Sequence, residues 1–212
     1  MDVLYLVRHG ETEWNRQRRM QGRLDSRLTP EGRAHARMHG QLLARERVSH
    51  MIVSPLGRTR ETADLILEGC GIPVTYDERL VERHCGEWEG LTIDEIADRY
   101  PDEWAARSRD PFHHRPPAGE NLPDMLLRIA PLAARLHEWP VRRLAVVSHG
   151  ISGRVLLTHF LGLAPSHADR VRQPNELVYR LSFSNGVVSC DHFRDGEGPH
   201  PGLFLHAPDQ VG

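Results

Sequence analysis

The sequence predicts an α/β fold, a three-layer α/β/α sandwich with a mostly parallel sheet flanked by helices. Short apolar runs recur along the chain, and helix-like stretches follow them, which is typical of parallel strands joined by helices. Near the C-terminus, an Asn-Gly pair separates two further apolar runs and predicts a β-hairpin. The expected parallel strands are 3–7, 51–54, 74–76 and 144–148, and the hairpin strands are 177–183 and 187–193.

The expected helices begin at recognisable start signals. Thr29 can cap a helix that has Pro30 at its first position, and apolar residues recurring every four positions carry this helix to about 45–47. The segment 92–95 has the form of a capping box, so a helix should begin at 93 and stop before Pro101. Further helices are expected at 59–67, 101–107, 123–139 and 151–161, whereas the tail from 196 has no clear pattern.

Length and composition favour a single domain. The 212 residues can bury a substantial core, and the insertion at about 91–121 resembles a lid on the sheet more than a second domain. A net charge of -2 does not indicate nucleic-acid binding. No run approaches the roughly 18 apolar residues of a membrane span. No signal peptide is recognisable, and Cys70, Cys85 and Cys190 are widely spaced, so we expect reduced thiols in a cytoplasmic protein. An exposed sheet edge would allow a homodimer.

Three of the expected strands end in residues that can bind or attack phosphate. Arg8 and His9 follow the first strand, Arg58 follows the second, and His149 follows the strand at 144–148. Ligands of open α/β sheets bind beyond the carboxyl ends of the strands, so these side chains should meet in one pocket.

Phosphoryl transfer depends mainly on positioning and positive charge. Arg8 and Arg58 provide planar forks for phosphate oxygens, and His149 adds a donor. His9 can attack phosphorus through an unprotonated ring nitrogen. Glu82, which follows another strand-like run, could protonate the leaving oxygen and then accept a proton from the attacking water.

Several motifs in order resemble the histidine phosphatase superfamily, the phosphoglycerate-mutase-like fold. The segments that carry the resemblance are Leu6-Val7-Arg8-His9-Gly10-Glu11-Thr12-Glu13-Trp14-Asn15, Gln21-Gly22, 28–32, 54–63, Glu82 with 86–90, Gly119-Glu120-Asn121 and Ser148-His149-Gly150. The resemblance covers nearly the whole chain up to the hairpin. It implies a phosphohistidine mechanism without a metal or other cofactor.

The resemblance also implies a role for each matching residue. His9 would be phosphorylated, Glu82 would be the acid/base, and Arg8, Arg58 and His149 would form the phosphate pocket. Asn15 and Gln21, with Gly22 beside it, match substrate-binding positions, and Gly150 would allow close approach after His149. The implied partner is a small phosphomonoester, or a phosphate or other oxyanion in the pocket.

The family contains phosphatases and cofactor-dependent mutases, and the sequence favours a phosphatase. The triplet at 82–84 is similar to mutases. Cys85 replaces a tyrosine that mutases usually have, Ile93 replaces a lysine, Arg115 stands without a neighbouring arginine, and Ile151 replaces an asparagine. The Gln21-Gly22 pair and the segment 86–90 are similar to the phosphatase branch.

Other readings stay open at this point. A phosphoglycerate mutase is the alternative enzyme, and a non-catalytic phospho-ligand binding module is a second alternative. His9 and His149 could instead bind a metal, although no Asp lies at the three strand ends. Trp88 is expected to serve packing, and His113 and His114 are expected to face solvent on the lid. The leaving group is not readable from the sequence.

Overall fold

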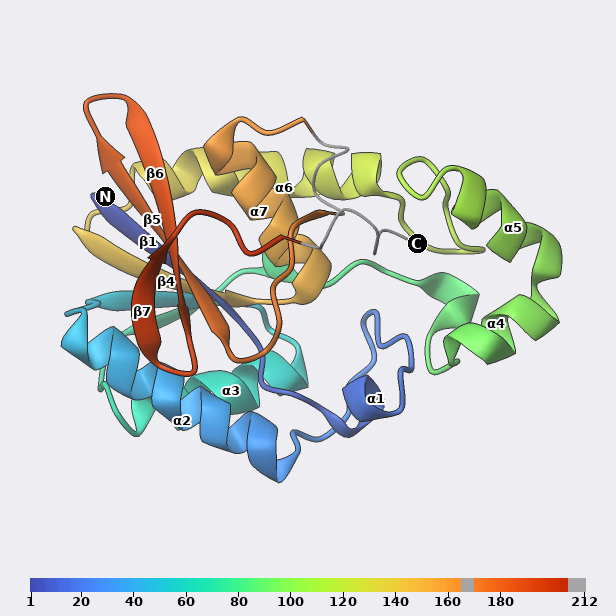
Figure 1. Cartoon of the computed structure of the whole chain (residues 1–212), viewed down its shortest axis with the longest axis horizontal. Coiled ribbons are helices and arrows are strands. Elements are labelled where there is room, and N and C mark those ends of the chain that lie inside the picture. Colours follow the sequence, from blue (N-terminus) through green and yellow to red (C-terminus); the bar gives the residue numbers. More distant parts are fainter. Residues whose placement is uncertain (165–169, 206–212) are drawn as a thin grey trace.

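The computed structural model describes residues 1–164 and 170–205. Its strands are β1 (Val3–Arg8), β2 (His50–Val53), β3 (Val74–Tyr76), β4 (Arg143–Ser148), β5 (Leu177–Ser184), β6 (Val187–Arg194) and β7 (Glu197–Pro201). They form one seven-stranded sheet in the order β3-β2-β4-β1-β5-β6-β7 (Figure 1). The β3, β2, β4 and β1 strands pair in parallel, and β5, β6 and β7 extend the sheet in antiparallel pairs.

Helices cover both faces of this sheet. They are α1 (Glu13–Arg16), α2 (Pro30–Arg45), α3 (Gly57–Leu67), α4 (Ile93–Arg99), α5 (Pro101–Arg109), α6 (Leu122–His137) and α7 (Gly150–Leu161), with 3-10 turns at Glu78–Leu80 and Gly86–Trp88. Figure 1 shows α6 and α7 above the sheet and α2 and α3 below it. The predicted α/β sandwich is therefore confirmed.

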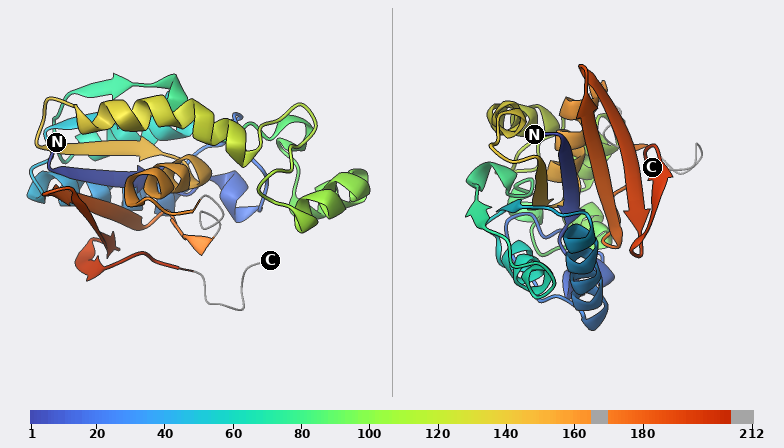
Figure 2. Two further views of the ribbon diagram at one scale, coloured as in Figure 1. Left: turned by 90° about the horizontal axis from the view of Figure 1, so that it is seen from above. Right: turned by 90° about the vertical axis from the view of Figure 1, so that its left-hand side faces the viewer.

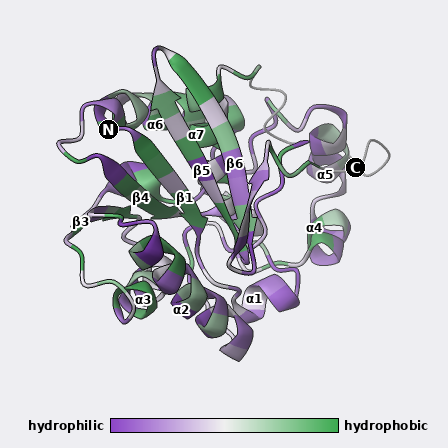
Figure 3. Ribbon diagram, turned by 60° about the vertical axis from the view of Figure 1, so that its left-hand side comes forward, coloured by the Kyte–Doolittle hydropathy of each residue, from purple (hydrophilic) through white to green (hydrophobic). Residues whose placement is uncertain are grey.

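Alternation along the central strands divides the core into two layers. Leu4 and Leu6 of β1 pack with α6 and α7, whereas Tyr5 and Val7 pack in the layer that contains α2 and α3. Successive strand residues point to opposite faces, so a strand covered on both sides must be apolar throughout. Figure 3 shows this as hydrophobic colour along β1 and β4, beside helices of mixed colour.

Most element boundaries agree with the predictions, and the exceptions have physical reasons. The segment before Glu82 is a 3-10 turn and not a strand. The tail expected to lack a pattern contains β7, whose Glu197–Pro201 sequence has little strand propensity. This strand lies at the sheet edge, where a proline need not donate to a ladder. The short helix α1 was also not predicted; Thr12 and Asn15 cap it reciprocally.

The segment predicted as a lid contains α4 and α5. Figure 2 (left) shows these helices beyond the ends toward which β1 and β4 run, away from the body of the sheet. Trp88 is buried and stacks on His114, with ring centroids 5.3 Å apart. The expectation that His114 faces solvent is wrong, because its side chain is 7% exposed and contacts Glu103. His113 is exposed as expected.

No helix in the described ranges is long and apolar enough to cross a bilayer.

The loop after β1 approaches α2 so closely that two glycines are needed. A Cβ on Gly10 would lie 2.4 Å from the carbonyl oxygen of Gly32. A Cβ on Gly32 would lie 2.2 Å from the carbonyl oxygen of Glu11. Backbone approach of this kind is one use of glycine. It holds the residue after His9 against the start of α2.

We expect Gly32→Ala to lower the free energy of unfolding by about 1–3 kcal/mol, because the added methyl group would force backbone apart. Gly71→Ala is the matched control, since a Cβ there meets nothing within 4 Å. Urea denaturation of both variants measures the difference. Equal stability of the two variants would show that this close approach is not a constraint.

Candidate functional site

Residues from the ends of three strands meet beyond the carboxyl end of the sheet. His9 follows β1 and His149 follows β4, and their ring centroids lie 5.3 Å apart. Arg58, in the first turn of α3, is near enough to lower the pKa of both imidazoles, as is Arg8 at the end of β1. The structure thus brings together the four side chains from which the sequence predicts a phosphate pocket.

His9 is held in the form that a nucleophile requires. Its Nδ1 lies 2.8 Å from the carbonyl oxygen of Gly10, which can only accept, so Nδ1 carries the proton. Burial lowers the pKa of His9 well below its ordinary value of 6.5, and the positive charges of Arg58 and Arg8 lower it further. The ring is therefore neutral near pH 7, and its other nitrogen, Nε2, carries a lone pair.

Arg58 is the most buried charge of the site, with 1% of its surface exposed. Its guanidinium donates to the carbonyl oxygens of Gly22 and Leu24 at 2.8 and 2.7 Å and to the Asp25 carboxylate at 2.9 Å. The loop at 22–25 therefore orients Arg58. Burial lowers the pKa of Arg58, while Glu82 and Asp25 oppose that shift.

Arg8 and His9 are both held by the segment that precedes β5. Arg8 Nη1 donates to the carbonyl oxygen of Gln173 at 3.0 Å, and Asn175 Nδ2 donates to that of His9 at 2.6 Å. His39 of α2 donates in turn to the Asn175 carbonyl oxygen at 2.9 Å. Burial lowers the pKa of Arg8 to about 10, so it stays charged at neutral pH.

His149 is oriented by Ser54 at the end of β2. Its Nε2 lies 2.7 Å from Ser54 Oγ, and both residues are fully buried. If the hydroxyl is the donor, Nδ1 keeps the proton and becomes a donor for a ligand. Burial, then Arg58, lowers the pKa of His149 well below 6.5.

Glu82 lies at the N-terminus of α7. Its carboxylate accepts from the backbone N–H groups of Ile151 and Ser152 at 3.0 and 3.2 Å and from the Arg83 N–H at 2.9 Å. The N–H groups of Ile151 and Ser152 are donors that the start of α7 leaves unsatisfied. His149, the residue before α7, makes no side-chain cap. Glu82 therefore caps α7 from a distant segment, which brings its carboxylate beside Gly150 and Arg8.

The remaining predicted residues have structural contacts of their own. Asn15 Oδ1 accepts from Thr12 in the cap of α1. Gln21 is buried, and its Oε1 has no partner in the part of the chain that the structure describes. Gly22 has a φ of +52°, and a Cβ there would lie 2.0 Å from Glu89 Oε1. A Cβ on Gly150 would lie 3.5 Å from the Arg8 guanidinium, so this glycine packs directly against it.

Three buried nitrogens around His9 have no hydrogen-bond partner among the described residues: the Nε donors of two arginines, and His149 Nδ1, which is a donor in the tautomer that accepts from Ser54. Within residues 1–164 and 170–205, nothing accepts from Arg8 Nε, Arg58 Nε or His149 Nδ1. A buried polar group without a partner costs free energy, and an anion could satisfy all three. The neutral imidazole of His9 thus lies among donors suited to a phosphoryl group.

Sequence reasoning missed the residues that orient these side chains. Glu120 and Arg128 form a two-pronged ion pair, with both contacts at 3.0 Å. Arg128 Nη1 also donates to the carbonyl oxygen of Val81, next to Glu82, at 3.0 Å, and Glu120 accepts from the His84 N–H and from Arg23. The Gly119-Glu120-Asn121 motif was a signal for Glu120. No local signal exists for Arg128, because the sequence does not distinguish it from Arg135, the exposed arginine on the same helix.

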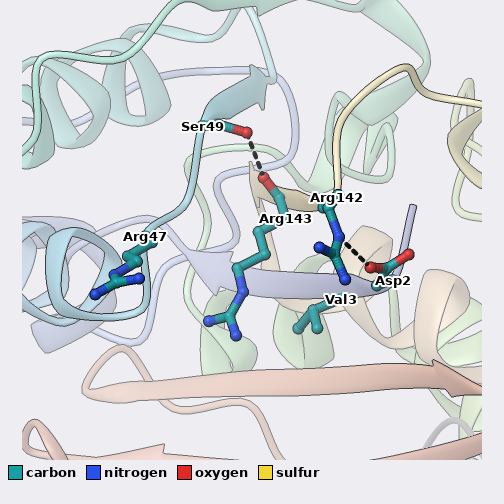
Figure 4. Close-up of a pocket in the computed structure, with 6 residues that line it drawn as sticks. All are labelled: Asp2, Val3, Arg47, Ser49, Arg142 and Arg143. Atoms are coloured by element: carbon teal, nitrogen blue, oxygen red, sulfur yellow. Dashed lines mark hydrogen bonds and ion pairs between the residues drawn. The ribbon is translucent and has the colours of Figure 1, made fainter.

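A second arginine-rich hollow, of about 460 Å³, lies at the opposite end of the sheet (Figure 4). Figure 4 shows Arg47, Arg142 and Arg143 there, with Arg142 directed to Asp2 at 2.7 Å. Its described lining contains no histidine, so it offers no imidazole that could form a phosphohistidine. In addition, no group of three or more His, Cys, Asp or Glu side chains in the described residues is arranged to hold a metal ion.

Comparison with known proteins assigns the family. The model of the histidine phosphatase superfamily (branch 1) matches residues 4–196. The chain belongs to this superfamily. A protein of Photorhabdus laumondii named "Probable phosphoglycerate mutase GpmB" is 40% identical over 185 residues, which are 86% of this chain and 85% of that protein. A protein of the same name from Serratia proteamaculans is 40% identical over 169 residues, 79% of this chain and 78% of that protein.

Solved structures share the fold. The mycobacterial glucosyl-3-phosphoglycerate phosphatase, in complex with VO3, superposes with a TM-score of 0.77 at 31% identity, over 86% of this chain and 93% of that one. The α-ribazole phosphatase of Shigella flexneri superposes with a TM-score of 0.85 over 95% and 99% of the two chains; at 23% identity it supports the fold alone. The chain is thus a histidine phosphatase superfamily enzyme, with phosphatase or mutase chemistry.

We expect Arg128→Ala to reduce turnover of alkyl phosphates more than turnover of p-nitrophenyl phosphate. The variant loses the hydrogen bond from Arg128 to the Val81 carbonyl oxygen, next to Glu82, the predicted proton donor. An alkoxide is a more basic leaving group than p-nitrophenolate, so its departure depends more on that proton. Initial rates on both esters measure the ratio. We expect it to change about tenfold.

Arg115→Ala is the control, because Arg115 pairs with Asp124 near the same helix but is 53% exposed. Arg128→Lys should restore part of the ratio, since lysine keeps the charge without the fork. If Arg128→Ala lowered both rates equally, the pair would be structural and not a positioning device for Glu82.

We expect stability to fall as the pH is lowered from 6.5 towards 4. Burial lowers the pKa of His39 from 6.5 to about 4, so in this range the unfolded chain binds a proton that the folded chain does not. The loss for His39 is about 2 kcal/mol at pH 5, and His9 and His149 act in the same direction. Urea denaturation at pH 7.5, 6 and 5 measures it. His39→Gln, which can still donate to Asn175, should show a shallower slope; an unchanged slope would contradict the assignment.

Proposed function

We propose that this chain is a metal-independent phosphomonoesterase that hydrolyses small phosphorylated metabolites through a phosphohistidine at His9. The observation that supports this most directly is a neutral imidazole, fixed by Gly10 at Nδ1, beside the unpaired donors of Arg8, Arg58 and His149. Binding a phosphate dianion would need the cations, but it would not need a nucleophile with its tautomer set. This argues against a non-catalytic binding module.

In the proposed first step, His9 Nε2 attacks phosphorus and the bond to the leaving oxygen breaks. Protonated Glu82 gives its proton to that oxygen, so the product leaves as an alcohol. Arg8, Arg58 and His149 stabilise the charge on the phosphoryl oxygens. Asn15, Gln21, Gly22 and Gly150 complete the proposed substrate-binding surface.

In the second step, Glu82 accepts a proton from water as the water oxygen attacks phosphorus. The P–N bond breaks, its electron pair returns to His9 Nε2, and inorganic phosphate is released. The same carboxyl group thus acts as acid and then as base. Ser54 supports both steps by orienting His149 at 2.7 Å.

A phosphoglycerate mutase is the second candidate, because the curated relatives at 40% identity carry that name. The residues at four mutase-like positions favour hydrolysis. Cys85 is 4% exposed in a cluster with Trp88, and Arg115 is paired with Asp124. Ile93 is exposed on α4, and Ile151 uses its N–H on Glu82. None of these side chains offers a free cation for a glycerate carboxylate.

We also propose one domain over 1–212, in which the segment 91–121 acts as a lid.

We expect His9→Ala to abolish both turnover and acid-labile labelling by a 32P-labelled phosphomonoester, since the acceptor nitrogen is lost. His113→Ala is the control, because that histidine is 68% exposed on the lid segment. Glu82→Gln should still be labelled by p-nitrophenyl phosphate, but it should hydrolyse the intermediate slowly. Full activity of His9→Ala would refute the nucleophile.

The same preparation separates the two enzyme classes. With 3-phosphoglycerate and a bisphosphoglycerate primer, a phosphatase releases inorganic phosphate, whereas a mutase rapidly forms 2-phosphoglycerate. We expect phosphate release, and we expect it to survive treatment with a chelator. Rapid formation of 2-phosphoglycerate would reassign the chain to the mutases.

A further inference from the structure

The peptide that joins His9 to Gly10 is hydrogen-bonded on both of its edges. Its carbonyl oxygen, which belongs to His9, accepts from Asn175 Nδ2 at 2.6 Å. Its N–H group, which belongs to Gly10, donates to Thr62 Oγ1 at 3.0 Å. The peptide is trans, so these two groups point to opposite sides of its plane, and the two hydrogen bonds together oppose rotation of that plane.

The orientation of this peptide matters because of the acceptor that follows it. The carbonyl oxygen of Gly10 holds Nδ1 of His9 at 2.8 Å. Where that oxygen points depends on the backbone angles of Gly10, and glycine allows more of these angles than any other residue. No other residue fits at this position, because a Cβ would lie 2.4 Å from the carbonyl oxygen of Gly32. The freedom of Gly10 must therefore be restricted from outside.

Thr62 of α3 restricts it from one side. Its hydroxyl donates to the carbonyl oxygen of Arg58 at 2.7 Å, so only its lone pairs can face the N–H group of Gly10. The side chain is fully buried, and a variant without this acceptor would leave the Gly10 N–H unsatisfied. One hydroxyl thus joins the peptide after His9 to the first turn of α3, which carries Arg58.

Asn175 restricts the peptide from the other side. It lies in the segment before β5, and its own backbone carbonyl oxygen accepts from His39 at 2.9 Å. His39 is 1% exposed on α2, so this support is itself fixed in the core. The same segment holds Arg8 through the carbonyl oxygen of Gln173. The peptide is therefore held between α3 and a segment that also orients a cation of the site.

We propose, on the basis of the proposed function, that Thr62 and Asn175 are positioning residues for His9. By fixing the peptide between His9 and Gly10, they keep the proton on Nδ1 and direct Nε2 at phosphorus. Neither side chain is among the buried donors of the pocket that lack a partner in the described residues. Their loss should therefore slow phosphoryl transfer without weakening the binding of phosphate.

The test measures two quantities for each variant. Rapid-quench labelling with 32P-labelled p-nitrophenyl phosphate gives the rate of phosphohistidine formation, and competitive inhibition by inorganic phosphate gives Ki. Thr62→Val keeps the shape of the side chain but not the acceptor, whereas Thr62→Ser keeps the hydroxyl. Thr158→Val is the matched control. Thr158 is also a buried helical threonine whose hydroxyl donates to the carbonyl oxygen four residues earlier, at 2.9 Å, but it lies on α7 and is not bonded to the peptide after His9.

We expect Thr62→Val to slow phosphohistidine formation about tenfold, because the nucleophile is less well aligned. The Ki of phosphate should stay nearly unchanged, since the cations of the pocket remain. Thr62→Ser and Thr158→Val should behave as the wild type. Asn175→Ala should reproduce the pattern of Thr62→Val, and it decides the test if circular dichroism shows that Thr62→Val does not fold.

Labelling of Thr62→Val and Asn175→Ala at the wild-type rate would overturn this inference alone. A loss of labelling with an equal loss of phosphate binding would also overturn it, because the two residues would then support the whole pocket and not the alignment of His9. If the wild type itself were not labelled, the proposed function would fail and this inference with it.

Discussion

The site depends on burying a guanidinium group without neutralising it. Arg58 is 1% exposed, yet two of its partners are the carbonyl oxygens of Gly22 and Leu24, and its carboxylate partner, Asp25, is itself 38% exposed. Carbonyl dipoles hold the cation in place but leave its charge available. Because charges act strongly where water is excluded, this arrangement favours a doubly negative phosphoryl group.

The same charge determines the state of the histidines. Burial lowers the pKa of His9 and of His149 well below 6.5, and Arg58 is the next cause for both. The cations of the proposed phosphate pocket thereby keep His9, the proposed nucleophile, neutral. Glu82 adds a carboxylate to this site. It lies at the N-terminus of α7, where it accepts hydrogen bonds from backbone N–H groups of the helix.

Much of the fold and of the candidate site could be predicted because the relevant signals are local. Apolar runs covered on both faces indicate parallel strands, and strand ends place Arg8, His9 and His149 at one edge. Predictions were weaker where tertiary packing overrides propensity. The edge strand β7 forms from a glycine- and proline-containing segment because β6 offers it a partner. His114 is buried because Trp88 provides a stacking surface that its neighbours in sequence do not reveal.

The sequence by itself determined the order of the central strands and the long helices, the family and the side chains proposed to bind phosphate, since each of these depends on periodicity or on short contiguous motifs. Tertiary structure decided how those side chains are held. Ser54 at His149, Gln173 at Arg8 and Arg128 beside Glu82 are separated from their partners by 95, 165 and 47 positions, the last counted to Val81. Hydrogen bonds across such separations depend on how strands and helices pack, and no local pattern encodes them.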